Sequence, residues 1–338
     1  MKRAQEEIQM KGLIFACPGC KKPFSYEKDP RSLRCRLCQI SFALTPYGFS
    51  DFRLLALEDS KPKGWDIEEI EKAYREMGDY EDNFAWAAKD GIPREVEAYR
   101  HKRLKGRVLE WLQGKTFEKI LVVGCGSGYF LYQIDEALKI PAKVLAGLEV
   151  SAEQLLKFRA RISKNKNQTG LPVLAGAEHL PLEENQFDLV VSSEVMEHIL
   201  RPDLGAREVF RVLKPGGIFC LTTPSFVPTE FWKAVFFIPR VLRRILQGRS
   251  IQGMNRLHVY DRPLSERRLQ QILRKSGFEI LRLERNIFLP HESFFPLFPS
   301  WLSHFFLKSG GFLESYAPFL GPLLGLHFVV ECRKPLTE

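Results

Sequence analysis

The stretch Lys119-Ile-Leu-Val-Val-Gly-Cys-Gly-Ser-Gly-Tyr129 decides the fold. A run of apolar residues leads into three glycines separated by small residues, and a helical pattern follows directly. Residues without a side chain let the backbone turn tightly and approach a ligand, with N–H groups of the next helix close behind. The pattern is typical of a nucleotide-type cofactor site, although a plain strand-to-helix turn would use the same glycines.

Outward from this stretch, short apolar runs alternate with amphipathic helical patterns from about Phe117 onward. Such alternation predicts an α/β fold with a doubly wound parallel sheet. The expected strands span 120–123, 144–148, 173–174, 187–192, 218–222, 278–283 and 326–332. The expected helices span 130–138, 152–163, 204–213 and 265–275. Two aromatic-rich stretches, at about 224–260 and 286–325, are too long for bare loops, so we expect inserts with helices that cap a site.

The domain organisation follows from composition and pattern. The chain has 338 residues, of which 27% are charged and 45% hydrophobic, as in ordinary globular proteins. We divide it into a small ribbon at 1–52, a linker with N-terminal helices at 53–116 and a large domain at 117–338. Within the linker, helical patterns lie at 66–77 and 95–112. Residues 1–11 are polar and no apolar stretch is long enough to span a bilayer, so we expect a cytoplasmic protein.

Two cysteine pairs stand near the N-terminus, as Cys17-x2-Cys20 and Cys35-x2-Cys38. Two pairs on turns can supply four thiolates in a tetrahedron, which is the geometry of a closed structural zinc site. Short apolar runs at 13–15 and 41–44 bracket the pairs and are expected to be strands. A redox site would need only one pair in a thioredoxin-like context, and incidental thiols are the remaining alternative. We expect zinc that stabilises rather than catalyses.

Further motifs follow the glycine stretch in a fixed order. Glu149 closes the next expected strand, where a carboxylate can bind both hydroxyls of a ribose. After it come Ala175-Gly-Ala-Glu-His-Leu-Pro181, Phe187-Asp-Leu-Val-Val-Ser-Ser-Glu-Val-Met-Glu-His198 and Arg211-Val-Leu-Lys-Pro-Gly-Gly-Ile218. With these motifs, residues 119–278 resemble the class I methyltransferases that use S-adenosylmethionine, in particular those that modify quinones, sterols and other small molecules.

The resemblance implies a seven-stranded, Rossmann-like, doubly wound methyltransferase sheet and assigns roles by position. The glycine loop would hold the methionine half of the cofactor, the acid after the second strand its ribose, and the Ala-Glu after the third its adenine. The segment after the fourth strand would line the methionine side. These roles fall on Gly124, Gly126, Gly128, Glu149, Ala177, Glu178 and Glu194. The turn at 214–217 is expected to be structural, with its two glycines supplying positive φ.

Two positions depart from the family pattern. Val122 stands where an Asp is usual, and Gly176 replaces a second acid. The losses predict weaker contacts to the cofactor's amino group and adenine, and they leave a non-catalytic binding protein as an alternative. The ribbon resembles modules that accompany RNA- and protein-modifying methyltransferases, and one heads a ribosomal-RNA guanine methyltransferase family. An rRNA or tRNA methyltransferase is therefore a second alternative.

A base is often needed to deprotonate an oxygen or carbon acceptor. The candidate catalytic residues are His198, after the fourth expected strand, and His258. Each also has an ordinary structural interpretation, as a packed turn residue or a hydrogen-bonded lid residue. Adenine-N6 chemistry is disfavoured because no Pro-Pro-aromatic turn follows the fourth strand. Cytosine-C5 chemistry is disfavoured because Cys125 and Cys220 lie in the cofactor loop and a buried strand.

The positive charge of the chain is concentrated in one region. The formal net charge is +9, and residues 231–275 hold 11 Lys or Arg against two acids. Overlapping this region, 229–247 forms a basic amphipathic pattern with Phe and Trp, which favours contact with a membrane surface, here the inner face, over RNA. Packing on the protein's own core is the alternative. We expect a small, hydrophobic or lipid-like acceptor, with RNA as the less favoured partner.

Overall fold

The computed structural model describes residues 13–22, 26–29, 32–53, 92–164, 170–226, 262–289, 299–321 and 325–336. The expected helix at 66–77, the basic pattern at 229–247 and His258 lie outside these residues. Among the described residues, no helix combines the length and apolarity needed to cross a membrane.

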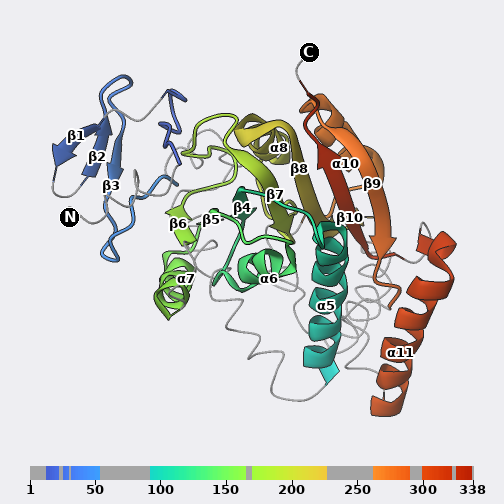
Figure 1. The fold of residues 1–338 in the computed structure, drawn as a ribbon. Helices are drawn as coiled ribbons and strands as arrows, with labels where there is room; N and C mark the ends of the chain where they lie inside the picture. The colour runs from blue at the N-terminus through green and yellow to red at the C-terminus, as the bar shows by residue number, and fades with distance from the viewer. Residues whose placement is uncertain are drawn as a thin grey trace, which may run out of the picture.

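A seven-stranded sheet forms the centre of the large domain, and all seven expected strands are confirmed (Figure 1). The strand order is β6-β5-β4-β7-β8-β10-β9. The strands are β4 Lys119–Val123, β5 Val144–Glu149, β6 Gly170–Leu174, β7 Phe187–Ser193, β8 Leu213–Pro224, β9 Glu279–Asn286 and β10 His327–Arg333. The predicted seven-stranded, doubly wound sheet is confirmed, and its strands are parallel except for β10, which pairs antiparallel with both β8 and β9.

The strand β8 begins earlier than expected. It includes residues 214–217, which the sequence predicted as a turn before the strand. Only Gly216 of its two glycines has positive φ, at 79°. The early start arises because Gly216 N–H donates to the Lys334 carbonyl at 2.8 Å and Lys334 N–H donates to the Gly217 carbonyl at 2.9 Å. Pairing with the chain beyond β10 therefore extends the strand.

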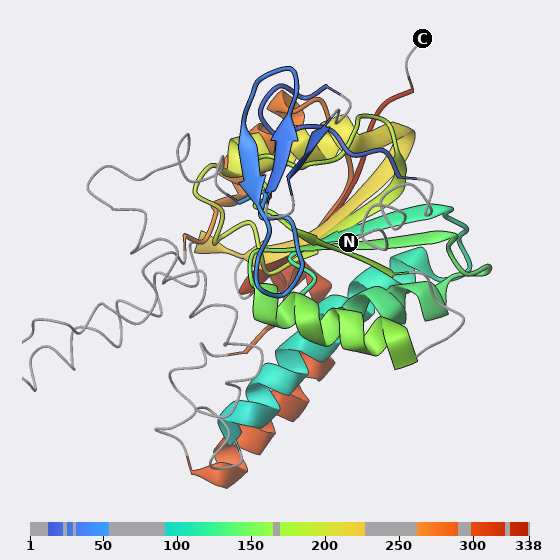
Figure 2. The ribbon, with the colours of Figure 1, turned by 90° about the vertical axis from the view of Figure 1, so that its left-hand side faces the viewer.

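Helices cover both faces of the sheet, as Figure 2 shows. One face carries α5 Ile92–Leu112, α6 Tyr129–Ala137 and α7 Ala152–Lys164, and the other carries α8 Pro202–Val212 and α10 Glu266–Lys275. The central strand β4 contributes buried side chains to the core on each face of the sheet, because successive side chains of a strand point to opposite faces. Ile120 and Val122 pack in the layer of α5 to α7, whereas Leu121 and Val123 pack in the layer of α8 and α10.

The N-terminal ribbon is a three-stranded antiparallel sheet of β1 Tyr26–Asp29, β2 Ser32–Cys35 and β3 Ser41–Ala43. It lies beside the β6 edge of the large sheet (Figures 1 and 2). Its apolar residues Phe15, Phe42 and Phe52 belong to the same buried cluster as the α8 and α10 layer. The strand expected at 13–15 is wrong, because Ile14 makes its hydrogen bonds to the loop between β6 and β7 instead of to the ribbon.

The stretch at 286–325 carries the helix α11 Ser300–Tyr316 and a short 3-10 helix, η2 Pro318–Leu320. Helix α11 packs along α5, and both project beyond the edge where β4, β7 and β8 end (Figure 1). Buried Glu314 joins the two helices, since it accepts from Tyr99 Oη at 3.1 Å and from Arg103 Nε at 2.6 Å. It also accepts from the Phe288 N–H at 3.0 Å, which fixes the chain after β9.

Candidate functional site

The glycine loop joins β4 to α6 at the carboxyl edge of the sheet. Gly124 and Gly128 have φ of 67° and 79°, a region that residues with a side chain rarely adopt. A Cβ on Gly124 would lie 2.3 Å from Val195 Cγ2, and one on Gly128 would lie 2.2 Å from Phe158 Cδ2. Close packing from both sides therefore requires glycine at these positions.

The carboxylate of Glu149 lies directly beside this loop. Its Oε2 accepts from Gly126 N–H at 3.0 Å, and its Oε1 accepts from the N–H groups of Val150 and Ser151 at 2.7 and 3.1 Å. The structure thus brings together the predicted methionine-side loop and the predicted ribose acid. Three backbone donors hold the carboxylate in place.

The predicted adenine-side residues lie in the loop after β6. Ala177 is buried, and Glu178 is only 2% exposed. The carboxylate of Glu178 accepts from Leu200 N–H at 3.2 Å, and burial raises its pKa. This contact gives Glu178 a structural role between two loops, and its role beside adenine stays a prediction.

Glu194 stands directly after β7 with φ of 57°, an uncommon backbone conformation for a residue with a side chain. Its N–H donates to the Thr222 carbonyl at 3.0 Å, and its Oε1 accepts from Thr222 Oγ1 at 3.0 Å. Its Oε2 lies 3.0 Å from Nε2 of His327, an ion pair when the imidazole is protonated. Burial alone would raise the pKa of Glu194, but the charge of His327, aided by Arg100 of α5, lowers it to about 2.

Sequence reasoning missed His327. It is the first residue of β10 and pairs with Pro224 of β8 and Asn286 of β9. Because β10 is antiparallel to its neighbours, its first residue lies at the edge where β7 and β8 end. The one available signal was a histidine at the start of the last apolar run, and its partner could not be inferred without the strand order.

Of the two predicted catalytic histidines, His198 lies among the described residues and His258 does not. His198 follows β7, and its Nε2 lies 3.8 Å from Oε1 of Glu197, whose other oxygen accepts from Thr223 Oγ1 at 3.0 Å. The side chain of His198 is 35% exposed. His258 lies outside the described residues, and both assignments stay predictions.

The structure brings Cys17, Cys20, Cys35 and Cys38 together, with all four sulfurs within 4.8 Å of one another. The Sγ atoms of Cys17 and Cys38 are 3.5 Å apart, and those of Cys20 and Cys35 are 3.8 Å apart. A tetrahedron with zinc–sulfur bonds of about 2.3 Å has edges of about 3.8 Å, so the cluster fits a zinc ion.

The two halves of this cluster repeat one backbone geometry. Lys21 N–H donates to the Cys17 carbonyl at 2.8 Å, and Gln39 N–H donates to the Cys35 carbonyl at 2.9 Å. Lys21 and Gln39 have φ of 57° and 63°. Burial alone would raise the pKa of Cys35, but the N–H groups of Cys38 and Leu37 lower it to about 7.

The remaining cysteines are poor nucleophiles. Cys220 and Cys332 are fully buried in β8 and β10, and burial raises the pKa of both thiols. Cys125 is 5% exposed within the glycine loop. A thiolate is the reactive form of cysteine, so these positions do not favour a cysteine nucleophile.

Comparison with known proteins agrees with this geometry. Residues 121–221, from β4 to β8, match the protein family described as methyltransferase domain. The chain therefore carries a class I, S-adenosylmethionine-dependent methyltransferase domain. The glycine loop, Glu149 and Glu194 all lie within the matched residues, so the candidate cofactor site belongs to the methyltransferase domain.

Relatives of this domain differ in the acceptors that their names specify. A tRNA U34 carboxymethyltransferase of Desulfotalea psychrophila is 36% identical over 147 residues, 43% of this chain and 44% of that protein. A chloroplastic 2-methyl-6-phytyl-1,4-hydroquinone methyltransferase of Oryza sativa subsp. japonica is 36% identical over 120 residues, 35% of this chain and 34% of that protein. The chain spans less than half the length of either relative.

A solved structure shows the same fold. It is a chain from the complex between the Haloferax volcanii Trm112 methyltransferase activator and a methyltransferase. The TM-score is 0.50 at 19% identity, over 78% of this chain and 99% of that chain. At this identity the likeness concerns the fold alone.

The donor set of the methyltransferase domain fits S-adenosylmethionine. The Glu149 carboxylate is hydrogen-bonded to the glycine loop through the Gly126 N–H, so the predicted ribose acid lies beside the predicted methionine-side loop. The two departures from the family pattern lie where the sequence indicated. Val122 is buried among apolar residues of the α5 to α7 layer, and Gly176 is buried in the loop after β6. Neither position offers a carboxylate to the cofactor.

Proposed function

We propose that this protein transfers a methyl group from S-adenosylmethionine to an oxygen or carbon atom of a small, hydrophobic or lipid-like acceptor. The observation that carries the proposal is an aromatic face on α11 and η2. It consists of large side chains that are 58–77% exposed, namely Trp301, Phe305, Phe312, Tyr316 and Phe319.

The spacing of Trp301, Phe305, Phe312 and Tyr316 places these four residues along one side of α11, since residues three, four or seven apart share a face. Phe319 follows them on η2. Exposed apolar groups gathered in this way mark interaction sites more often than scattered ones do. Trp and Tyr are the residues enriched where proteins meet the membrane–water interface. The aromatic face therefore suits contact with a lipid surface.

Its position relative to the candidate site supports the same acceptor class. Helix α11 packs along α5, and α5 carries Arg100 and His101, whose charges act on Glu194. The aromatic face thus lies on the helix pair that flanks the carboxyl edge of the sheet (Figure 1). A hydrophobic acceptor leaving a membrane would enter from this side.

Basic residues add an electrostatic contribution. The exposed residues of α10 include Arg267, Arg268, Arg274 and Lys275. They belong to the positively charged stretch 231–275, which overlaps the amphipathic pattern at 229–247. Each basic side chain near an anionic surface contributes about 1 kcal/mol. We propose peripheral contact with a membrane through 229–247 as well as through the aromatic face.

When bound, S-adenosylmethionine supplies an electrophilic methyl group. Gly124, Gly126 and Gly128 would hold it on the methionine side, and Glu149 would bind its ribose. Methyl transfer to a hydroxyl oxygen requires removal of the hydroxyl proton. His198 and His258 are the candidate groups to accept that proton. Zinc bound by the four cysteines would stabilise the ribbon and leave no position open for chemistry.

Radiolabelled transfer tests the acceptor class. Purified protein would be incubated with methyl-tritiated S-adenosylmethionine and, separately, with a bacterial lipid extract or with total RNA. We expect label in the organic phase with the lipid extract, and none with the Gly126→Arg variant. Label in RNA instead would overturn the lipid-like acceptor.

The alternative of an RNA acceptor is favoured by one specific observation, the 36% identity to a protein named as a tRNA U34 carboxymethyltransferase. The same labelling experiment includes it as the RNA arm. A third interpretation, a binding protein without turnover, predicts cofactor binding with no label in either fraction.

A further inference from the structure

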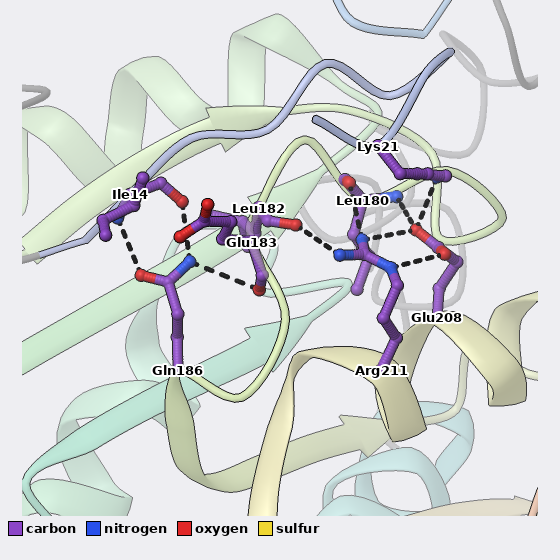
Figure 3. Close-up of polar contacts among 8 residues, drawn as sticks. All are labelled: Ile14, Lys21, Leu180, Leu182, Glu183, Gln186, Glu208 and Arg211. Atoms are coloured by element: carbon purple, nitrogen blue, oxygen red, sulfur yellow. Dashed lines mark hydrogen bonds and ion pairs between the residues drawn. The ribbon is translucent and has the colours of Figure 1, made fainter. Parts of the chain in front are cut away.

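Hydrogen bonds and an ion pair join the ribbon to the methyltransferase domain, as Figure 3 shows. Gln186 binds both backbone groups of Ile14: its Oε1 accepts from the Ile14 N–H at 2.7 Å, and its Nε2 donates to the Ile14 carbonyl at 2.6 Å. Lys21 Nζ lies 2.8 Å from Oε2 of Glu208 on α8. The ribbon therefore has a fixed position against the loop between β6 and β7.

The tail that leaves the ribbon reaches further, to the ends of β5 and β6. Phe52 N–H donates to the carbonyl of Leu174, the last residue of β6, at 3.1 Å. Arg53 Nη1 donates to the carbonyl of Val150 at 2.9 Å, directly after β5. These are the strand ends that carry the predicted adenine-side and ribose-binding residues.

Arg53 is itself held in one orientation. Its Nε and Nη2 donate to the two carboxylate oxygens of Asp51 at 2.9 and 2.6 Å. Both side chains are at least four-fifths shielded from solvent, with exposures of 20% for Arg53 and 16% for Asp51. A forked, charge-assisted pair of this kind fixes the guanidinium plane, so Nη1 is directed at Val150.

The peptide that Arg53 holds also orients Glu149. Val150 and Ser151 donate their N–H groups to Oε1 of Glu149, and Gly126 donates to Oε2. The carbonyl bound by Arg53 belongs to the peptide between Val150 and Ser151. One peptide unit therefore separates Arg53 from the Glu149 carboxylate, so a substitution of Arg53 that moves this peptide would also change the orientation of the carboxylate.

We propose that Arg53 is a positioning residue of the cofactor site. By holding the turn after β5, it sets the orientation of Glu149 and thereby the affinity for the adenosine part of S-adenosylmethionine. Docking of the ribbon is then part of cofactor binding. The inference rests on the proposed function only in that the domain binds this cofactor.

Calorimetry with S-adenosylhomocysteine tests the proposal in the full-length, zinc-loaded protein. Arg53→Gln should weaken binding about tenfold, the size seen when a group that orients a binding residue is removed. Arg159→Gln is the matched control. Arg159 also joins the ribbon tail to the domain, through the Tyr47 carbonyl at 2.9 Å and the Phe49 ring at 4.8 Å, without contacting the turn after β5. Its affinity should match that of wild type.

A double-mutant cycle separates positioning from folding. In the Glu149→Gln background, Arg53→Gln should weaken binding by less than about twofold, because its effect acts through the Glu149 carboxylate. Arg53→Lys, which keeps the charge but loses the fork, should fall between Arg53→Gln and wild type. Equal losses in both Glu149 backgrounds, or no loss at all while wild type binds, would overturn the role of Arg53. Failure of wild type itself to bind would defeat cofactor use as well.

Discussion

The ribbon and helix α11 are both additions to the same sheet, at opposite ends of it, and they bury their aromatic residues very differently. In the ribbon, Phe15, Phe42 and Phe52 are 9%, 0% and 5% exposed and belong to the core of the large domain. On α11, Trp301 and Phe312 are 70% and 61% exposed. Buried side chains of this size contribute about 1.5–3 kcal/mol each to folding, whereas exposed ones contribute little.

This difference in burial indicates that the aromatic residues of the ribbon contribute to stability, whereas those of α11 are available to bind a partner. The ribbon covers the β6 edge and contacts the turns that carry the candidate cofactor residues, so it acts as part of the methyltransferase domain. Helix α11 is anchored by Glu314 on one side and offers its aromatic face on the other. Changes in the ribbon should therefore lower stability and cofactor affinity, whereas changes on the aromatic face should alter partner binding alone.

The largest effect is expected from loss of the zinc ion that we propose the four cysteines bind. Cys35→Ser, or removal of zinc with a chelator, should lower the free energy of unfolding by about 4 kcal/mol or more, because buried thiolates lose their common ion. Elemental analysis should give one zinc per chain for wild type, and urea unfolding measures the loss. A metal-free preparation that is equally stable would show that the four cysteines do not form a zinc site.

A smaller loss is expected at the interface of the ribbon with α8. Glu208 accepts from Lys21 and Arg211 at 2.8 Å each and from Leu180 N–H at 2.8 Å. Glu208→Gln should cost about 3 kcal/mol, because it leaves two partly buried cations without their carboxylate. The exposed Glu136 on α6 provides the control, and Glu136→Gln should change stability by less than about 0.5 kcal/mol. Equal effects of the two changes would contradict a structural interface.

The sheet was predictable because its strands are short apolar runs separated by amphipathic helices and marked by the glycines at 124–128. The four zinc-type ligands were predictable from spacing alone. The docking of the ribbon was not, because it depends on polar residues such as Gln186 and Glu208 that have no local signature. The Glu194–His327 pair depends on the antiparallel insertion of β10, which local patterns do not specify.

The Glu194–His327 pair predicts a pH dependence of stability. The pKa of Glu194 is about 2 in the folded protein, below the value of about 4.3 for a free glutamate. Its contribution is therefore complete above about pH 4.3 and is lost as the pH falls toward 2. Over that range, wild type should lose up to about 1.4 kcal/mol per pH unit more than Glu194→Gln in urea unfolding. Parallel curves for the two proteins would exclude a stabilising ion pair.

The smallest effect on stability is expected on the aromatic face. Replacing Trp301, Phe305 and Phe312 with Gln should change the free energy of unfolding by less than about 0.5 kcal/mol each, because these side chains are exposed. The same variant should lose flotation with phosphatidylglycerol vesicles. Control changes Ile140→Gln and Leu336→Gln remove exposed apolar groups outside α11 and should leave flotation intact.

A companion variant tests the basic stretch. Arg240, Arg243 and Arg244 changed together to Glu should weaken vesicle binding, and added salt should weaken it in wild type. Competition with tRNA is the control for RNA binding. Wild type that binds RNA tightly but not anionic vesicles would replace the lipid-like acceptor with RNA.

Cofactor binding by the full-length protein tests the central claim most directly. Titration of wild type with S-adenosylhomocysteine in a calorimeter should give one bound molecule per chain. Gly126→Arg should abolish binding, because Gly126 has φ of 52°, a region that residues with a side chain rarely adopt, and its N–H donates to Glu149. Near-ultraviolet circular dichroism would establish that the variant is folded. A wild-type protein that gives no binding heat and no rise in melting temperature with this ligand would contradict the account.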